Sequence, residues 1–463
     1  MKKHGGRPER SRDARVSHPF RKEREKEGAP KTEAKTAQGE QKPPDQILQI
    51  EKPIYGGAFL ARAEGKAVFV PLVLPGEQAR VRMVDEKRGY STAETEEIVA
   101  AAPERVAAPC GHFGACGGCQ YQHATYGAQL EYKKAILRET LERGGVRAPE
   151  EIDVLAAEPW AYRNRIRVAF DKDGRPGYRG RRSHAVVPIA ECPIAAPLLV
   201  KAALSAGELF RRFAVPSRPA ELSLFSNKAE DSMLASVFTD GTARVPLTDY
   251  FDALLPLIPS LCGVELVEVH QGRAATIARA GSESIAYRVA GFDYRVDHGA
   301  FFQVNRWLVD GLVERVIGGQ RGELAWDLFA GVGLFARQLA ESFEQVVAVE
   351  TAPAAIGALK HNLSGTSAMA VSASTLDFLR GGRKAERPDL IVVDPPRTGL
   401  GADATTLLAE IGALEMTYVS CDPATLARDL KALVDAGYAI ESMTLADLFP
   451  QTFHLETVVR LRR

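Results

Sequence analysis

The chain has 463 residues, with 59 Lys and Arg against 59 Asp and Glu, and its residues are 45% hydrophobic and 25% charged. This length suggests about three domains, and this composition is that of a globular protein, which excludes a disordered or fibrous chain. Its apolar runs are far shorter than the ~20 residues that cross a bilayer, and its basic N-terminus lacks the apolar core of a secretory signal. We therefore expect a cytoplasmic protein without membrane contact, whose cysteines are metal ligands, catalysts or core residues rather than disulfides.

Residues 1–45 form a tail of distinct composition, with 13 Lys or Arg against 8 Asp or Glu. Because the tail has almost no apolar residues, it cannot offset its ordering entropy, and we expect it to be disordered. Its positive charge suits loose contact with phosphates. A solubilising tail is an equally good interpretation.

Residues 46–103 are typical of a small closed β-barrel. Short alternating strands are separated by glycine turns, and such barrels can hold single-stranded nucleic acid. The predicted strands include residues 59–62, 66–70, 79–85 and 95–100.

Residues 104–300 predict a central domain of mixed strands and helices, which includes a helix at 129–143. In residues 162–168, alternation places Arg163, Arg165 and Arg167 on one face of a strand. Three neighbouring guanidinium groups are typical of phosphate or base contact. A solvated strand face is the alternative, and the pattern alone favours neither.

Residues 301–463 predict an α/β domain, because from Leu324 onward apolar strands alternate with helices. Such a doubly wound sheet binds its ligand beyond the carboxyl ends of its strands. The predicted strands are 324–329, 345–350, 369–373, 390–394, 416–420, 440–446 and 454–461.

The first strands of this domain carry candidate cofactor residues. Gly331 and Gly333 follow the first strand, where glycines let the backbone approach a ligand, although a simple tight turn is the alternative. Glu350 ends the next strand, where a carboxylate can accept hydrogen bonds from ribose hydroxyls. Asp394 ends the fourth strand and is followed by two prolines. A short glycine motif without the full dinucleotide fingerprint favours a nucleoside without a pyrophosphate, and S-adenosylmethionine is such a ligand.

Two residues are candidate reacting groups. Cys421 lies between a strand and a predicted helix at 424–436, with Asp422 as its cap and Pro423 in its first turn. A thiol at a helix N-terminus is expected to favour the nucleophilic thiolate, and a buried structural cysteine is the alternative. Glu456 lies among apolar residues at the start of the last strand, where burial would raise its pKa and let it take a proton. A surface glutamate is the alternative.

A separate cysteine cluster has C-x5-C-x2-C spacing in a glycine-rich loop, with Cys110, Cys116 and Cys119. Cys192 is the natural fourth ligand, and Cys262 is then most simply a core residue. The spacing alone leaves tetrahedral zinc and a four-iron cluster open. Two neighbouring histidines are further zinc candidates, although ordinary loop roles suit them better: His112 and His123.

Five motifs together resemble the RNA uracil-5-methyltransferase family over residues 46–463. They are Phe302-Gln303-Val304-Asn305, Asp327-Leu328-Phe329 with its glycines, Asp394-Pro395-Pro396-Arg397, Ser420-Cys421-Asp422-Pro423 and His454-Leu455-Glu456. The resemblance implies a Rossmann-like methyltransferase domain at 301–463, a TRAM RNA-binding barrel at 46–103, and S-adenosylmethionine held by Gln303, Phe329, Glu350 and Asp394. Leu334 departs from the family's glycine motif, and a further cofactor contact near Thr375 is left open.

The resemblance also implies a mechanism. Cys421 adds to C6 of uracil and so activates C5 for methylation, and Glu456 then removes the C5 proton as general base. The target base must leave its stack. Part of the family carries a [4Fe-4S] cluster on four cysteines in this pattern, with a structural or RNA-orienting role.

The barrel and the cluster together resemble the enzymes that act on 23S ribosomal RNA. The alternative substrate is the T-loop uridine of transfer RNA, and the alternative from another class is a non-catalytic RNA-binding or assembly protein. A methylase of base exocyclic amines would place an aromatic residue at Arg397, and a cytosine-5-methyltransferase normally shows different cysteine motifs. We expect a monomer.

Overall fold

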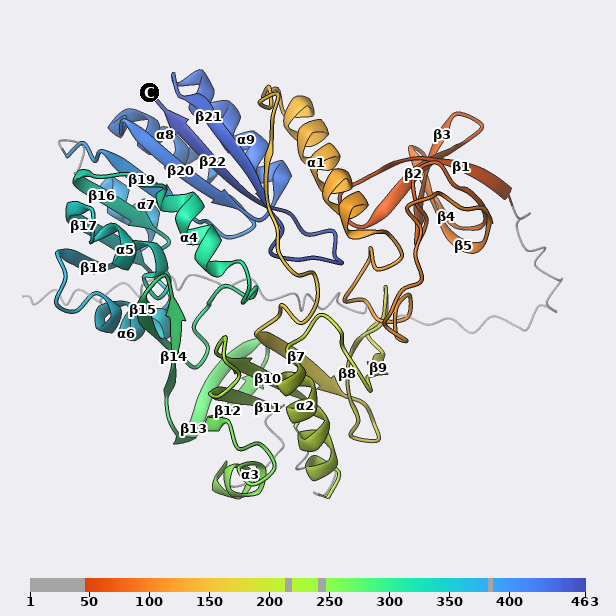
Figure 1. Cartoon of the computed structure of the whole chain (residues 1–463), viewed down its shortest axis with the longest axis horizontal. Coiled ribbons are helices and arrows are strands. Elements are labelled where there is room, and N and C mark those ends of the chain that lie inside the picture. Colours follow the sequence, from red (N-terminus) through yellow and green to blue (C-terminus); the bar gives the residue numbers. More distant parts are fainter. Residues whose placement is uncertain (1–45, 213–218, 240–246, 382–385) are drawn as a thin grey trace, which may run out of the picture.

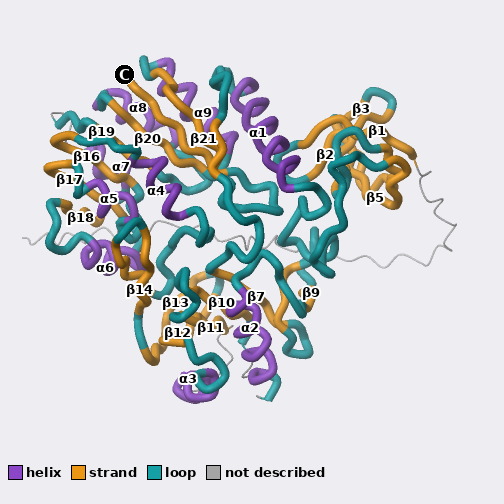
Figure 2. Tube along the Cα trace, in the orientation of Figure 1, coloured by secondary structure: helices purple, strands orange, loops and turns teal. Residues whose placement is uncertain are grey.

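A computed structural model describes residues 46–212, 219–239, 247–381 and 386–463. The tail predicted at 1–45 lies outside the described residues. Figure 1 shows three bodies: an N-terminal barrel, a sheet in the middle of the chain and a C-terminal α/β sheet. Loops meet at the centre, between the three bodies (Figure 2). In the described part of the chain, no helix has both the length and the apolar run needed to cross a membrane.

The N-terminal body is a closed barrel with strand order β1-β2-β3-β5-β4, which confirms the predicted small barrel. Alternate side chains such as Phe59, Val68 and Val81 point inward and are buried, as the alternating sequence requires. The strands are β1 (Gln46–Pro53), β2 (Ala58–Ala63), β3 (Lys66–Pro71), β4 (Gln78–Glu86) and β5 (Tyr90–Ala100).

The middle body is a sheet with the order β13-β12-β11-β10-β7-β8-β9 among the described residues. Helices α2 and α3 pack on one face, where Leu199, Leu222 and Val264 are buried. The elements are β7 (Arg165–Phe170), β8 (Pro176–Arg179), β9 (Val186–Pro188), α2 (Pro197–Phe210), β10 (Glu221–Ser226), β11 (Met233–Thr239), α3 (Leu247–Leu254), β12 (Leu261–His270) and β13 (Arg273–Gly281).

The C-terminal body is a doubly wound sheet, with the order β18-β17-β16-β19-β20-β22-β21-β6 among the described strands. Strands β16 to β20 pair in parallel, and β22 is antiparallel to both of its neighbours. The elements are β16 (Gly322–Leu328), α5 (Leu334–Leu339), β17 (Phe343–Glu350), α6 (Pro353–Asn362), β18 (Ala368–Ser372), α7 (Thr375–Arg380), β19 (Leu390–Val393), α8 (Gly401–Ile411), β20 (Glu415–Ser420), α9 (Pro423–Asp435), β21 (Ala439–Ala446) and β22 (Glu456–Arg462).

Two elements that precede the middle sheet belong spatially to the C-terminal body. The helix α1 (Tyr126–Arg143) packs against α9, and β6 (Asp153–Leu155) extends the sheet in parallel with β21. Part of the predicted 104–300 region thus completes the C-terminal sheet. Because β6 has only three residues, its sequence carries no periodicity that could have indicated this pairing.

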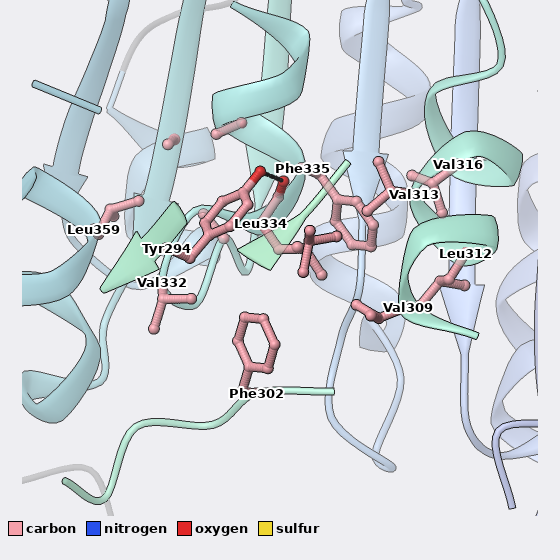
Figure 3. Close-up of a cluster of buried hydrophobic side chains, with 14 of the residues drawn as sticks. Tyr294, Phe302, Val309, Leu312, Val313, Val316, Val332, Leu334, Phe335 and Leu359 are labelled. Carbon is pink, nitrogen blue, oxygen red and sulfur yellow. Dashed lines mark hydrogen bonds between the residues drawn. The ribbon is translucent and has the colours of Figure 1, made fainter. Parts of the chain in front are cut away.

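A hairpin and a helix join the middle body to the C-terminal body. They are β14 (Ser284–Val289), β15 (Phe292–Asp297) and α4 (Val309–Ile317). Figure 3 shows the shared core, in which Phe302 packs near Tyr294 and Val332. The hydroxyl of Tyr294 donates a hydrogen bond to the carbonyl of Leu334 at 3.0 Å (Figure 3). This core fixes the segment after β15 against the start of α5.

Candidate functional site

Four predicted site residues lie along one edge of the C-terminal sheet. Strands β16, β19 and β20 are parallel, so Phe329, Asp394 and Cys421 follow neighbouring carboxyl ends. Because β22 is antiparallel, its first residue Glu456 comes to the same edge. Ser420 pairs with Thr457, which places Cys421 and Glu456 beside each other on adjacent strands. The topology therefore brings the predicted nucleophile and base together.

The glycine loop after β16 is held in an unusual backbone conformation. Phe329, Gly331 and Gly333 have φ of 75°, 56° and 89°, a region that only glycine adopts at little cost. A β-carbon on Gly333 would come within 2.8 Å of Leu359 Cδ1, so α6 packs against bare backbone there. A β-carbon on Gly331 would meet open space, which leaves that backbone accessible to a ligand.

Glu350 fastens this loop to the end of β17. Its Oε2 accepts a hydrogen bond from Gly331 N–H at 2.7 Å. Its Oε1 accepts from the N–H groups of Thr351 and Ala352, at 2.7 and 2.6 Å. Each carboxylate oxygen can accept more than one bond. Glu350 can therefore hold the glycine loop and still accept from a ribose hydroxyl.

Two further carboxyl groups at this edge are buried, and burial raises the pKa of both. The pKa of Asp327 is raised to about 8 by burial and then by the charges of Asp394 and Glu350, although a hydrogen bond from Ala336 N–H opposes the rise. Burial raises the pKa of Asp394 to about 7. Oδ1 of Asp327 is buried and has no hydrogen-bond partner among the described residues. A buried acceptor without a donor beside an open glycine fits a ligand that carries a positive charge and hydroxyl or amino donors.

Gln303 lies in the segment between β15 and α4, next to Phe302 of the shared core. It is buried, and its carbonyl accepts a hydrogen bond from Asn164 Nδ2 at 2.9 Å. Asn305 Nδ2 donates to Leu448 O at 3.2 Å, which ties this segment to the loop before β22. Thr375 is buried at the start of α7. The structure does not test the cofactor contact that the sequence analysis left open near Thr375.

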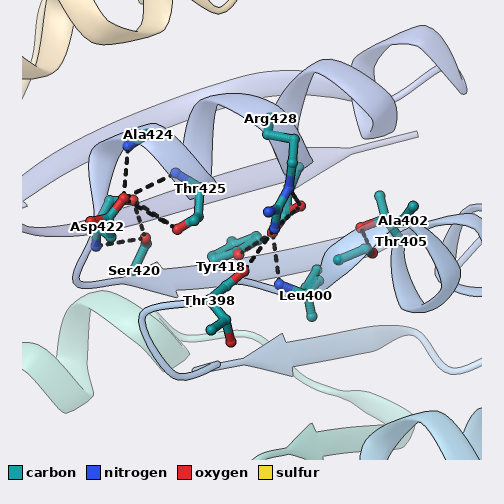
Figure 4. A network of polar contacts seen from close by, with 12 residues as sticks. Thr398, Leu400, Ala402, Thr405, Tyr418, Ser420, Asp422, Ala424, Thr425 and Arg428 are labelled. Carbon is teal, nitrogen blue, oxygen red and sulfur yellow. Dashed lines mark hydrogen bonds and ion pairs between the residues drawn. The ribbon is translucent and has the colours of Figure 1, made fainter. Parts of the chain in front are cut away.

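Cys421 immediately precedes α9. Asp422 caps the helix, because its Oδ1 accepts from the N–H groups of Ala424 and Thr425, both at 3.0 Å (Figure 4). On the same helix, Asp429 Oδ2 accepts from Tyr418 O–H and Leu400 N–H. These bonds fix the thiol-bearing turn against the loop that follows Asp394.

The thiol does not favour the thiolate in this structure, and the prediction from its helix position was wrong. The pKa of Cys421 is raised to about 12, first by burial and then by the charges of Glu456 and Asp394, which outweigh the attraction of Arg397. The Asp422 side chain also accepts hydrogen bonds from the first two N–H groups of the helix, those of Ala424 and Thr425, since Pro423 has none. The neighbours of the thiol, which the sequence does not reveal, therefore decide its protonation.

Glu456 is buried, and burial together with the charge of Asp394 raises its pKa, against the opposing charge of Arg397. The sequence predicted this direction. A ring nitrogen of His454, Nδ1, lies 3.0 Å from a guanidinium nitrogen of Arg397. The pKa of His454 is lowered to about 4 by burial and then by Arg397, so this imidazole is neutral and accepts the bond.

Sequence reasoning missed Tyr55, which the barrel contributes to this edge. Its ring meets Phe453 edge to face, with centroids 5.5 Å apart. The pKa of Tyr55 is raised by burial and then by the charge of Asp422, which places the phenol beside the capped turn of Cys421. A tyrosine before a Gly-Gly turn gives no sequence signal for a contact more than 300 residues away.

The loop before β22 is anchored by buried polar contacts that were also missed. Lys133 Nζ on α1 forms a fully buried ion pair with Asp447. Gln451 O accepts hydrogen bonds from the N–H groups of Gln120 and Tyr121, at 2.9 and 3.0 Å. The anchored loop leads directly into His454 and Glu456. A lysine on a helix is normally exposed, so only its burial identifies this one as an anchor.

The structure brings the four clustered cysteines around one cavity of about 260 Å³. They are Cys110, Cys116, Cys119 and Cys192. All six cysteines are free thiols. Among the described residues, no group of three or more His, Cys, Asp or Glu side chains is placed to hold a metal ion.

The two nearby histidines bond to the backbone. His112 Nε2 accepts from Ala190 N–H at 3.1 Å, and His123 Nε2 lies 3.1 Å from Val73 O. The predicted row of three arginines is present, since Arg163, Arg165 and Arg167 alternate with buried residues and all line the cysteine cavity. Arg167 is exposed and pairs with Glu221, whereas Arg165 is largely buried.

Comparison with known proteins adds independent findings. A family profile described as "tRNA (Uracil-5-)-methyltransferase" matches residues 384–463. An "Uncharacterized RNA methyltransferase" of Streptomyces avermitilis is 34% identical over 437 residues, which cover 89% of this chain and 97% of the relative. The 23S rRNA (uracil(1939)-C(5))-methyltransferase of Chromohalobacter salexigens is 32% identical over 470 residues, which cover 99% of this chain and 94% of the relative.

A solved structure is similar over nearly the whole chain. It is the Pyrococcus abyssi tRNA (uracil-54, C5)-methyltransferase in complex with S-adenosyl-L-homocysteine, with a TM-score of 0.72 and 25% sequence identity. The match covers 90% of this chain and 100% of that one. The barrel, the middle sheet and the α/β sheet thus have counterparts in one solved structure.

Proposed function

Since this chain belongs to the S-adenosylmethionine-dependent RNA uracil-5-methyltransferase family, we propose that it methylates C5 of one specific uridine in 23S ribosomal RNA. The observation that carries the chemical part is the placement of Cys421 and Glu456 side by side at the carboxyl edge of the sheet. The ribosomal substrate is supported by the Chromohalobacter salexigens relative, whose name gives that activity.

We assign the cofactor site to the glycine loop and its neighbours. Gly331 leaves the backbone open, Gly333 lets the loop pack closely against α6, Glu350 offers acceptors to ribose hydroxyls, and Asp394 lies at the adjoining strand end. Phe329 and Gln303 border the same site. S-adenosylmethionine, when bound, supplies an electrophilic methyl carbon on a positively charged sulfur. A bound cation would favour the ionised form of these buried carboxyl groups and lower their raised pKa, so the cofactor and the carboxylates would stabilise each other.

Cys421 Sγ adds to C6 of the flipped uracil, forming a carbon–sulfur bond and an enolate with negative charge at C5. The thiol proton passes to Asp394, which leaves Glu456 ionised for the later step, since burial and the flanking charges keep that proton on sulfur at rest. After C5 gains its methyl group, Glu456 takes the C5 proton as general base. The electron pair of that carbon–hydrogen bond restores the ring double bond, and Cys421 leaves as thiolate.

We further propose that the cysteine cavity holds a [4Fe-4S] cluster on Cys110, Cys116, Cys119 and Cys192. The residues fit, because four thiols line one cavity of about 260 Å³ and cluster ligands are thiolates. The next residues, Gln120 and Tyr121, hold Gln451 in the loop before β22, so the cluster would act by orienting that loop.

The barrel at 46–103 is, in this proposal, a TRAM domain that binds RNA. The middle region at 104–300 guides the RNA, and residues 301–463 carry the transfer chemistry. We place the protein in the cytoplasm as a monomer.

Transfer RNA is the second candidate substrate, favoured by the name of the Pyrococcus abyssi enzyme and of the matching family profile. The deciding experiment incubates the purified protein with labelled S-adenosylmethionine and undermodified ribosomal or transfer RNA, then maps 5-methyluridine. We expect label at one uridine of 23S RNA. Label in transfer RNA alone would reverse the choice of substrate, and label in neither would favour a non-catalytic RNA-binding protein.

A further inference from the structure

The middle sheet has a second cavity that the proposed mechanism does not use. Helices α2 and α3 cover one face of the sheet, and the opposite face bears a cavity of about 510 Å³. Strands β7, β10, β11, β12 and β13 form its walls, together with the turn after β15. Among the described residues that line it, none belongs to the proposed nucleophile, base or glycine loop.

One side of this cavity combines positive charge with aromatic rings. The guanidinium carbon of Arg165 lies 4.3 Å from the ring centroid of Phe225, and that of Arg167 lies 4.0 Å from the ring centroid of Phe238. Nε of Arg165 is buried and has no hydrogen-bond partner in the described part of the chain. Guanidinium planes and aromatic rings are the surfaces on which proteins stack unpaired RNA bases, and free guanidinium donors bind phosphates.

The other side of the cavity carries a buried carboxylate. The carboxylate of Glu265 accepts hydrogen bonds from Ser236 Oγ at 2.8 Å and Thr276 Oγ1 at 3.1 Å, and its residue is 4% exposed. The imidazole of His298 is buried, with Nδ1 3.9 Å from Glu265 Oε1, and neither ring nitrogen has a hydrogen-bond partner among the described residues. Buried polar atoms without partners are rare in folded proteins, so they point to a ligand that completes them.

His298 offers one donor and one acceptor. The pKa of His298 is lowered, because burial outweighs the attraction of Glu265. The ring is therefore neutral near pH 7. Arg279, on the exposed edge strand β13, is the cation nearest to Glu265 and lies 3.5 Å from its Oε2.

A cavity with opposite charges on its two sides distinguishes between classes of ligand. The carboxylate of Glu265 repels a free phosphate, whereas the arginines on the other side attract one. A nucleotide satisfies both ends, since its phosphate is anionic and its base carries amino donors. Arg163 lines this cavity and pairs with Asn305, whose Nδ2 donates to Leu448 O, so the cavity is connected to the loop that leads to Glu456.

We propose that this cavity is a second nucleotide subsite, which receives an unstacked base flanking the target uridine and favours a base with an exocyclic amino group. Glu265 accepts the amino hydrogens, and His298 pairs with a ring nitrogen beside them. Arg165 and Arg167 stack along the strand and hold the phosphate. This inference rests on the proposed action on RNA, and it adds a sequence preference that the catalytic edge alone does not give.

The test measures binding of short single-stranded RNAs by fluorescence anisotropy. Each RNA has seven nucleotides with a central uridine, and each flanking position in turn carries A, G, C, U or an abasic sugar. For the intact protein, we expect one flanking position at which replacement of an amino-bearing base by uracil or an abasic sugar weakens binding about tenfold. The substitution Glu265→Gln should abolish this preference, because an amide is a poorer acceptor for amino hydrogens.

Glu268→Gln is the matched control, since Glu268 lies on the same strand with the opposite parity and faces away from the cavity. His298→Phe is the second variant, and thermal unfolding shows whether each variant is folded. The proposal is overturned if no flanking position shows a preference, or if folded Glu265→Gln and His298→Phe proteins both keep it. Formation of 5-methyluridine on intact RNA is scored separately, so loss of the subsite and loss of the enzyme function give different results.

Discussion

The molecule holds buried thiols in two regions, and the groups around them differ. Cys421 stands alone beside Glu456 and Asp394, at a strand end that faces a glycine loop. The other cluster surrounds a cavity with four thiols and is bordered by arginines. Burial raises the pKa of Cys421 and also that of Cys119, each to about 12. Burial alone therefore does not distinguish the two regions. What distinguishes them is the neighbouring carboxyl groups in one case and the neighbouring thiols in the other.

Removing the thiol of Cys421 should have the largest effect on activity. Cys421→Ala should lower methylation by at least about a thousandfold, because no other group can add to C6. Binding of S-adenosylmethionine and the melting temperature should change little. Cys262→Ala is the matched control, since that thiol belongs to neither region and packs against the core shared by the middle and C-terminal bodies. A Cys421→Ala protein with near-normal activity would refute covalent catalysis.

Removing a thiol from the cysteine cavity should have a smaller effect on activity. Cys119→Ser should remove the iron of the proposed cluster and its visible absorption, while activity falls by roughly tenfold through a misplaced active-site loop. The fall should appear in kcat more than in the Kd for RNA, because Gln120 and Tyr121 hold Gln451 rather than RNA. Iron analysis after anaerobic purification and single-turnover kinetics give the two readouts. Full activity without iron would show that the cavity does not position the loop.

These two regions also show what the sequence can and cannot reveal. The strands from Leu324 onward were predicted within about two residues, because buried parallel strands are short apolar runs between helices. The motifs identified Cys421 and Glu456, and the spacing grouped the cysteines. The sequence could not reveal Tyr55, the Lys133–Asp447 pair or strand β6, since each depends on contacts between distant segments. It also gave the wrong protonation for Cys421, because the opposing carboxylates come from other strands.

Tyr55, between β1 and β2 of the barrel, lies beside the turn that carries Cys421. Its substitution therefore tests whether the barrel supports that turn. Tyr55→Ala should reduce kcat by about tenfold, since the Phe453 ring would lose its packing partner beside the catalytic edge. Tyr90→Ala is the control, because that tyrosine is exposed on the barrel. Equal effects of both variants on kcat would show that the barrel acts through RNA binding alone.

The smallest expected effect concerns the protonation of the lone thiol. Its raised pKa means that alkylation of the Cys421 peptide should be slow at neutral pH and should rise with pH without a plateau up to about pH 10. Glu456→Gln removes a neighbouring negative charge, so the thiol pKa should fall and alkylation at alkaline pH should become a few times faster. Glu441→Gln, an exposed carboxylate on β21, should leave the rate unchanged. A plateau near pH 7 in the unliganded protein would show that the thiol is already ionised.

The central claim is that a carbon–sulfur bond forms between Cys421 and the target uridine and is released only after Glu456 removes a proton. The most direct measurement is the mass of the Cys421 peptide after Glu456→Gln protein is incubated with S-adenosylmethionine and substrate RNA, then digested with nuclease and protease. The account predicts a peptide that carries a methylated uridine nucleotide, which Cys421→Ala protein cannot form. An unmodified Cys421 peptide, from a reaction in which intact protein makes 5-methyluridine on the same RNA, would contradict it.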